Sequence, residues 1–119
     1  MSNLLSVTGE ILFDKDIEPF FGATAYVRLQ DVSMSDAPSK TISEQILKNV
    51  GHDPNNPKHI AFSLYPENYD PMGRYVVSIH IDINGNGVLD LGDLINMESY
   101  PVLTHGYPNR VSVEVKQIR

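Results

Sequence analysis

A run of twelve residues, 82–93, places oxygen-bearing groups at the spacing that a calcium-binding loop uses. Such a loop takes ligands from its positions 1, 3, 5, 7, 9 and 12 and carries a glycine at position 6. Gly87 falls at the sixth position and the apolar Leu89 at the eighth. The residues at the ligand positions are Asp82, Asn84, Asn86, Val88 (through its backbone carbonyl), Asp90 and Asp93. Ca²⁺ prefers carboxylate and carbonyl oxygen, so the sequence predicts a structural calcium site here.

The charge of this loop predicts a weak site. Only Asp82, Asp90 and Asp93 are anionic, and aspartate at the twelfth position is one methylene shorter than the usual glutamate. We therefore expect a dissociation constant on the order of 10⁻⁵ to 10⁻³ M. A site of this affinity fills more readily outside the cytoplasm than inside it.

The residues ahead of the loop predict a strand rather than the helix of an EF-hand. Residues 74–81 are β-branched, aromatic and alternating, which is typical of a strand. We therefore expect an ion that stabilises the loop. We do not expect the calcium-driven opening of a helix pair that occurs in EF-hand proteins. The alternative is that Asn84-Gly85 and Asn86-Gly87 are only the turn dipeptides of a hairpin. That alternative does not explain why three carboxylates fall at ligand positions of the calcium-loop pattern.

Other residues with chemical potential have ordinary structural roles as alternatives. The segment 31–36 carries two carboxylates and two hydroxyls, which suit a second cation or a partner surface but also a simple turn. Among the four histidines, only His80 lies near a candidate ligand. We expect its side chain to be solvated or to serve as a capping residue, not as a metal ligand. Tyrosine side chains could stack on a sugar or a peptide, or pack in the core. These are Tyr65, Tyr69, Tyr75, Tyr100 and Tyr107.

Motifs of catalysis do not support an enzyme. The sequence has no Gly-x-Ser-x-Gly elbow, no phosphate-binding glycine-rich loop and no His-Glu-x-x-His. No pair of carboxylates is singled out for glycoside hydrolysis. We therefore predict a non-enzymatic protein.

Size and charge limit the class of protein further. The 119 residues suit one domain over 1–119, and the absence of cysteine excludes disulfides and thiolate sites. A net charge of −6 argues against nucleic-acid binding. No apolar run approaches the ~20 residues of a transmembrane helix. The first residues have no basic or apolar leader region and no lipidation cysteine, which predicts a cytoplasmic protein or one whose leader was removed.

Alternating apolar residues predict strands along most of the chain. Turn-forming proline, glycine and asparagine separate these runs, which favours an all-β sandwich or barrel. The runs are 7–13, 23–31, 60–64, 75–81 and 111–115. Segment 41–50 is ambiguous, because Thr41 and Glu44 have the spacing of a helix capping box.

Several blocks along the chain resemble the YbaY/YscW family of small bacterial lipoproteins. The most specific block is 29–37, Leu-Gln-Asp-Val-Ser-Met-Ser-Asp-Ala, which is similar to the family pattern L-x-D-x-S-x-x-D-A. The other blocks are 7–10, 22–37, 60–65, 75–81 and 100–104. The resemblance implies a single antiparallel β-sandwich of about seven to eight strands, Greek-key or transthyretin-like, in which 41–50 is a strand.

The resemblance also implies a role and a place. One branch of the family acts as pilotins, lipoproteins that chaperone the ring-forming secretin of a secretion system, so we expect a secretin or other envelope protein as partner, in the periplasm or at the outer membrane. The chain departs from that branch by lacking the lipid-bearing cysteine and by carrying the fuller 82–93 loop. A carbohydrate-binding or adhesive module with exposed tyrosines is the second hypothesis. A hydrolase is the third.

Overall fold

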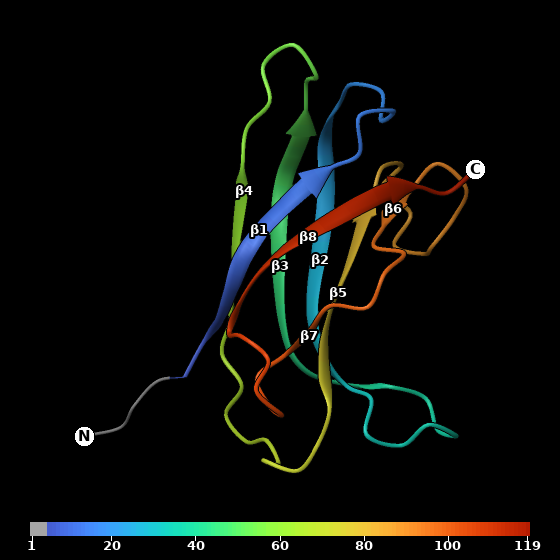
Figure 1. Cartoon of the computed structure of the whole chain (residues 1–119). Coiled ribbons are helices and arrows are strands. Elements are labelled where there is room, and N and C mark those ends of the chain that lie inside the picture. The colour runs from blue at the N-terminus through green and yellow to red at the C-terminus, as the bar shows by residue number, and fades with distance from the viewer. Residues whose placement is uncertain (1–4) are drawn as a thin grey trace.

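The computed structural model describes residues 5–119, and within that range the chain forms eight strands (Figure 1). The strands are β1 (Val7–Phe13), β2 (Phe20–Asp31), β3 (Lys40–His52), β4 (Ile60–Leu64), β5 (Tyr75–Asp82), β6 (Leu94–Ile95), β7 (Pro101–Val102) and β8 (Arg110–Gln117). The prediction of an all-β chain is confirmed, and 41–50 lies in a strand. The first residues, in which the sequence shows no leader region, include 1–4, which lie outside the described part of the chain. Across residues 5–119, no helix is long and apolar enough to span a membrane.

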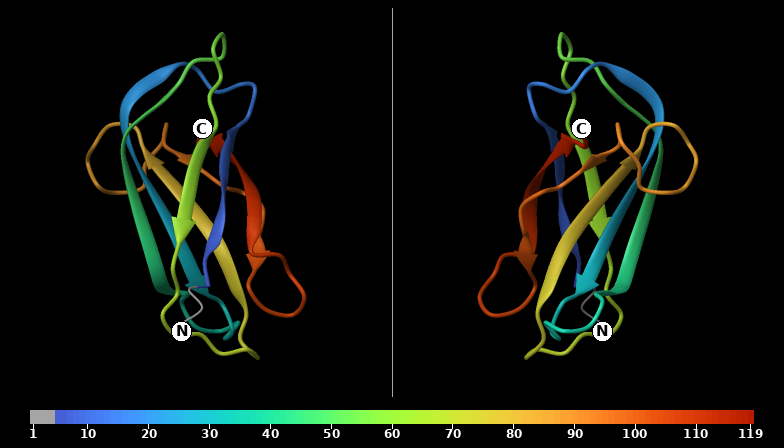
Figure 2. Two further views of the ribbon diagram at one scale, coloured as in Figure 1. Left: turned by 90° about the vertical axis from the view of Figure 1, so that its left-hand side faces the viewer. Right: turned by 90° about the vertical axis from the view of Figure 1, so that its right-hand side faces the viewer.

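All eight strands belong to one sheet. The order is β3-β2-β5-β6-β8-β1-β4, and β7 pairs with β5 outside this path. The sheet curls until its two end strands, β3 and β4, lie beside each other, so that it is nearly barrel-shaped (Figure 2). The predicted sandwich with Greek-key or transthyretin-like topology is not confirmed, because a single curled sheet holds both halves of the fold.

The sheet is mixed rather than purely antiparallel, which corrects the prediction. β1 and β8 run parallel in the register from Thr8↔Arg110 to Phe13↔Val115, whereas the other strand pairs are antiparallel. A parallel pair needs a long connection rather than a tight hairpin. β1 and β8 meet this requirement because they are the first and last strands and the other six lie between them in sequence.

The core lies inside the curl and is built by the alternating residues that the sequence singled out. On β2 and β5 these residues are almost wholly buried, and β8 contributes two more from the opposite side. They are Ala25, Val27, Leu29, Tyr75, Val77, Ile79, Ile81, Val113 and Val115. Because side chains along a strand point alternately to opposite faces, their neighbours in sequence lie closer to solvent.

Gly9 lets the parallel pair and the core approach each other. It sits opposite Val111 on β8 and opposite Phe62 on β4. A Cβ at this position would lie 1.8 Å from the Val111 carbonyl oxygen and 2.8 Å from the Phe62 ring. A backbone oxygen in a paired strand has little freedom to move away. Any larger residue must therefore push β1 away from β8.

We expect Gly9→Ala to lower the free energy of unfolding by about 3 kcal/mol, because the added methyl overlaps a backbone oxygen in a packed sheet. Chemical denaturation measures the loss. The matched control is Thr8→Ala on the same strand, whose side chain is only partly buried, and there we expect a loss below about 1 kcal/mol. Equal stabilities for the two variants would contradict this account of Gly9.

Candidate functional site

The predicted calcium loop connects β5 to the two-residue strand β6. The expectation that a strand leads into the loop is confirmed, since β5 runs to Asp82 without interruption. Gly85, Gly87 and Gly92 have φ angles of 74°, 77° and 92°. These angles belong to the left-handed region, which glycine adopts without the steric penalty of a Cβ. The glycines therefore allow a tight loop to form from position 82 to position 93.

Asp82 organises the first half of the loop. Its side chain is buried, with 2% of the residue exposed. Its Oδ1 accepts the backbone N–H of Gly85 at 3.1 Å, and its Oδ2 accepts that of Gly87 at 2.8 Å. A carboxylate that accepts two backbone N–H groups offsets the desolvation that burial imposes. The carboxylate at the first position of the loop is therefore fixed by backbone N–H groups of the same loop.

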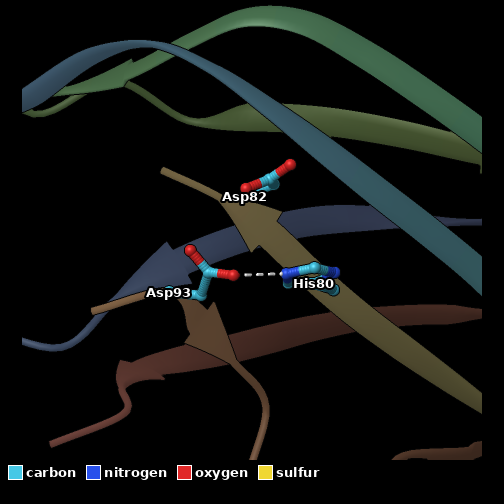
Figure 3. A group of neighbouring side chains, drawn as sticks. All are labelled: His80, Asp82 and Asp93. Carbon is cyan, nitrogen blue, oxygen red and sulfur yellow. Dashed lines mark hydrogen bonds and ion pairs between the residues drawn. The ribbon is translucent and has the colours of Figure 1, made fainter. Parts of the chain in front are cut away.

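Asp93 does the same for the second half and is even more buried, at 1% exposure. Its Oδ1 accepts the backbone N–H of Ile83 at 3.0 Å, and its Oδ2 accepts that of Asp90 at 3.2 Å. The same Oδ2 lies 2.8 Å from Nε2 of His80, which projects from β5 (Figure 3). One side chain thus joins both ends of the loop to the strand that precedes it.

His80 was expected to be solvated or to cap, and that expectation is wrong. Its side chain is only 12% exposed, and its ring stacks on Tyr26 with 5.7 Å between centroids. Ligand atoms of His80, Asp82 and Asp93 all lie within 4.8 Å of one another. The signal in the sequence was the position of His80, two residues before Asp82 on one strand. What that spacing could not reveal is that the loop returns Asp93 to the same place.

Asp90 and the two asparagines form the exposed side of the loop. The Oδ2 of Asp90 accepts the side-chain amide of Asn84 at 3.0 Å and that of Asn86. These two amides, Asn84 first, lower the pKa of the Asp90 carboxyl because they stabilise its charged form. The amide oxygens point elsewhere: Asn84 Oδ1 accepts the N–H of Asn86 at 3.3 Å, and Asn86 Oδ1 accepts that of Val88 at 3.1 Å.

The structure therefore brings the six predicted ligands into one loop but in two groups. Asp82 and Asp93 converge in the buried part beside His80. Asn84, Asn86 and Asp90 bond to one another on the outer side, and Val88 is 59% exposed. Chemically, the buried group offers a cation one imidazole nitrogen and two carboxylates whose ligand atoms lie within 4.8 Å of one another. The outer group would have to turn two amides to offer oxygen inward.

The second candidate, the segment 31–36, forms a turn rather than a cluster of free oxygens. Oδ1 of Asp31 accepts both the N–H of Ser33 at 2.9 Å and its hydroxyl at 2.5 Å. The Ser33 hydroxyl is the main cause that lowers the pKa of Asp31, because it stabilises the carboxylate. Ser33 Oγ in turn accepts the N–H of Arg74 at 2.9 Å. The pattern ties the end of β2 to the start of β5.

We expect Asp93→Ala to lower the free energy of unfolding by about 3 kcal/mol, because it leaves the partly buried N–H groups of Ile83 and Asp90 without an acceptor and removes the partner of the His80 ring. The matched control is Asp90→Ala, which removes a carboxylate from the exposed side of the same loop and should leave stability almost unchanged. Urea denaturation in the presence of a chelator compares the two without any contribution from calcium. A loss for Asp90→Ala as large as that for Asp93→Ala would contradict this division of the loop.

The comparisons with known proteins agree with the resemblance seen in the sequence. Residues 2–115 match a family model described as the type III secretion system lipoprotein chaperone YscW. The solved structure of an alternative pilotin from the type II secretion system of Vibrio cholerae is similar, with 25% sequence identity and a TM-score of 0.77 over 98% of this chain and 99% of that chain. No curated protein matches the sequence. Because the family model covers nearly the whole chain, the chain belongs to the YscW family of type III secretion system lipoprotein chaperones.

Proposed function

We propose that this protein is a non-enzymatic chaperone of the bacterial envelope that binds a component of a protein-secretion system. The observation that carries the proposal is the family match over residues 2–115, which extends from before β1 to the end of the core part of β8. The likeness to a pilotin also supports it, because that likeness extends over 98% of this chain. The partner that fits best is a secretin, the ring-forming outer-membrane protein of such a system, and the place of action is the periplasm or the outer membrane.

The tyrosines give less support to the alternative, a carbohydrate-binding module. Tyr75 is 3% exposed, and its hydroxyl oxygen accepts the backbone N–H of Asp70 at 2.8 Å. The hydroxyl oxygen of Tyr100 accepts the N–H of Glu114 at 3.1 Å. Tyr69, though partly exposed, packs edge-on against Tyr75 with 6.1 Å between ring centroids. These three side chains act in packing and in holding loops. Tyr65 and Tyr107 are exposed, at 57% and 46%, so two of the five tyrosines stay available to the alternative. The chaperone proposal is preferred because of the family match.

Secretin assembly tests the proposed function. In the bacterium that encodes this protein, deletion of its gene should lower the amount of secretin multimer in the outer membrane several-fold, because an unescorted ring-former is lost before assembly. Gel analysis of outer-membrane fractions measures the multimer, and reintroduction of the gene is the control. Unchanged multimers of every secretin in the deletion strain would refute the proposal.

We also propose that the 82–93 loop binds Ca²⁺ as a structural ion. What supports this proposal is the convergence of Asp82 and Asp93 from opposite ends of the loop, with Asp90 as a third carboxylate in the same loop. Binding by Asn84 and Asn86 requires their amides to turn, so that oxygen replaces the nitrogen that now faces Asp90. Calcium would then exchange hydrogen bonds within the loop for coordination and would hold β5 to β6.

With the dissociation constant of about 10⁻⁵ to 10⁻³ M that the charge of the loop predicts, 10 mM calcium should raise the free energy of unfolding by about 1 to 4 kcal/mol relative to a chelator. Asp82→Ala should abolish the rise but also disturbs the loop backbone. Asp90→Asn is therefore the sharper variant, since it removes one charge at the exposed side and keeps the side-chain size. Identical melting curves in chelator and in excess calcium would exclude the calcium site and leave the chaperone proposal untouched.

A further inference from the structure

His80, Asp82 and Asp93 form a cluster of nitrogen and oxygen donors under the 82–93 loop (Figure 3). His80 and Asp82 are two residues apart on β5, so their side chains belong to the same face of the sheet. Asp93 returns to them because it immediately precedes β6, which pairs with β5. One ligand atom from each of the three side chains lies within 4.8 Å of the others. Strand pairing, rather than the exposed side of the loop, therefore builds this cluster.

The two carboxylates of the cluster are buried with too little positive charge beside them. Asp82 is 2% exposed and Asp93 is 1% exposed. Within residues 5–119, Asp93 is paired with His80 alone, and Asp82 has no ion-pair partner. Even a protonated imidazole carries one positive charge, which cannot balance two carboxylates. Buried charges are usually paired or coordinate a metal ion, and one divalent cation would balance both carboxylates.

Both carboxylates keep lone pairs for an ion although they already accept hydrogen bonds. An ionised carboxylate has about four lone-pair sites. Asp82 and Asp93 each use two of them for backbone N–H groups of the loop. In the described part of the chain, Nε2 of His80 is the one further donor to either carboxylate. The backbone bonds therefore hold the carboxylates in fixed positions and leave them able to coordinate.

The imidazole decides which class of ion fits. Ca²⁺ and Mg²⁺ take oxygen ligands, whereas imidazole nitrogen suits first-row transition metals such as Zn²⁺. Zn²⁺ binds nitrogen and carboxylate oxygen at about 2.0–2.2 Å, so two ligand atoms of one ion are at most ~4.3 Å apart. Nε2 of His80 and Oδ2 of Asp93, at 2.8 Å, are within that range. The limit of 4.8 Å for all three ligand atoms is slightly wider, and small side-chain rotations would close the difference.

His80 is held in place and remains accessible from solvent. Its ring stacks on Tyr26, which fixes the orientation of the imidazole. A hollow of about 260 Å³ reaches His80, and Leu89 of the loop is part of its wall. Arg28 also lines this hollow, but it pairs with Glu44 at 2.6 Å, which offsets its repulsion of a cation. The hollow therefore gives a hydrated ion a route to the imidazole.

We propose that His80, Asp82 and Asp93 bind one Zn²⁺ ion through Nε2 and one oxygen of each carboxylate, with water in the fourth position. The coordinating imidazole is neutral and carries its hydrogen on Nδ1. The hydrogen bond between Nε2 and Asp93 is thereby replaced by two coordination bonds to the ion. The role of the ion is structural, because it joins β5 to the residue that precedes β6.

The zinc site differs from the proposed calcium site in its ligands. Zn²⁺ uses the buried group alone and needs no turning of Asn84 or Asn86, which now direct nitrogen to Asp90. The two ions share Asp82 and Asp93, so the loop holds one of them at a time. The inference goes beyond the chaperone function and does not rest on it.

Isothermal titration calorimetry of the metal-free full chain with ZnCl₂, and separately with CaCl₂, tests the site. We expect one Zn²⁺ per chain, bound at least ten-fold more tightly than Ca²⁺, because the imidazole adds a ligand that favours zinc. An absence of Zn²⁺ binding, or binding no tighter than that of Ca²⁺, would overturn the proposal. Either result would leave the chaperone proposal standing.

Variants place the zinc on the buried group. His80→Phe removes the nitrogen ligand but keeps an aromatic ring against Tyr26, and it should weaken Zn²⁺ binding at least ten-fold. His59→Gln controls for zinc bound at the surface, since the His59 side chain is 75% exposed beside Glu10. Asp90→Asn separates the two ions, because it removes a carboxylate that calcium would use and zinc would not. A loss of Zn²⁺ binding in His59→Gln or Asp90→Asn as large as that in His80→Phe would overturn the proposal.

Nitrogen-15 NMR of the histidine rings identifies the ligand in the unaltered chain, so this test does not depend on the folding of a variant. The chain has four histidines, and their ring nitrogens report separately on metal binding. Zn²⁺ should shift Nε2 of His80 to the position of a metal-bound imidazole nitrogen and leave the other three rings almost unchanged. A shift of another histidine in place of His80 would overturn the proposal.

Discussion

The continuity of the whole sheet passes through the two-residue strand β6, and Asp93 is the residue that fixes β6 in place. Leu94 and Ile95 pair with β5 on one side and with β8 on the other. Immediately before them, the backbone carbonyl of Asp93 accepts the N–H of Ile118 at 2.9 Å, while its carboxylate bonds to Ile83, Asp90 and His80. The ladder of β6 has two residue pairs on each side, and the bonds of Asp93 extend the connection beyond it. A buried carboxylate with several donors gives the crossing its rigidity.

The five long strands with clear alternation could be read from the sequence because each buries one face. β1 begins at Val7 and ends at Phe13, as the pattern predicted, and the buried rows on β2 and β5 fall where alternation placed them. β6 and β7 could not be found in this way, since two residues cannot show a period. The parallel pairing of β1 with β8 was equally hidden, because register between the two ends of a chain leaves no local trace.

The candidate site shows a similar division between what spacing reveals and what it does not. Phase along the chain was enough to predict that Asp82 and Asp93 approach each other, since a loop with glycine at its centre must return. It was not enough to include His80, whose contact with Asp93 depends on the register of β5 against β6. Nor does residue type reveal which way an amide points. Asn84 offers its nitrogen to Asp90 and its oxygen to the backbone, a choice made by the hydrogen bonds around it.

The 82–93 loop and the start of β2 are connected through the ladder between β2 and β5. The ladder between β2 and β5 ends at Thr24, which pairs with Asp82 at the mouth of the loop. Beyond that point, toward Phe20, β2 is paired within the described residues 5–119 with β3 alone, and there with shifted register. The irregular part of β2 therefore begins close to where the support of β5 stops. A loop that fixes the end of β5 sets how far β2 is held, and leaves the exposed Phe21 on a segment with one neighbour instead of two.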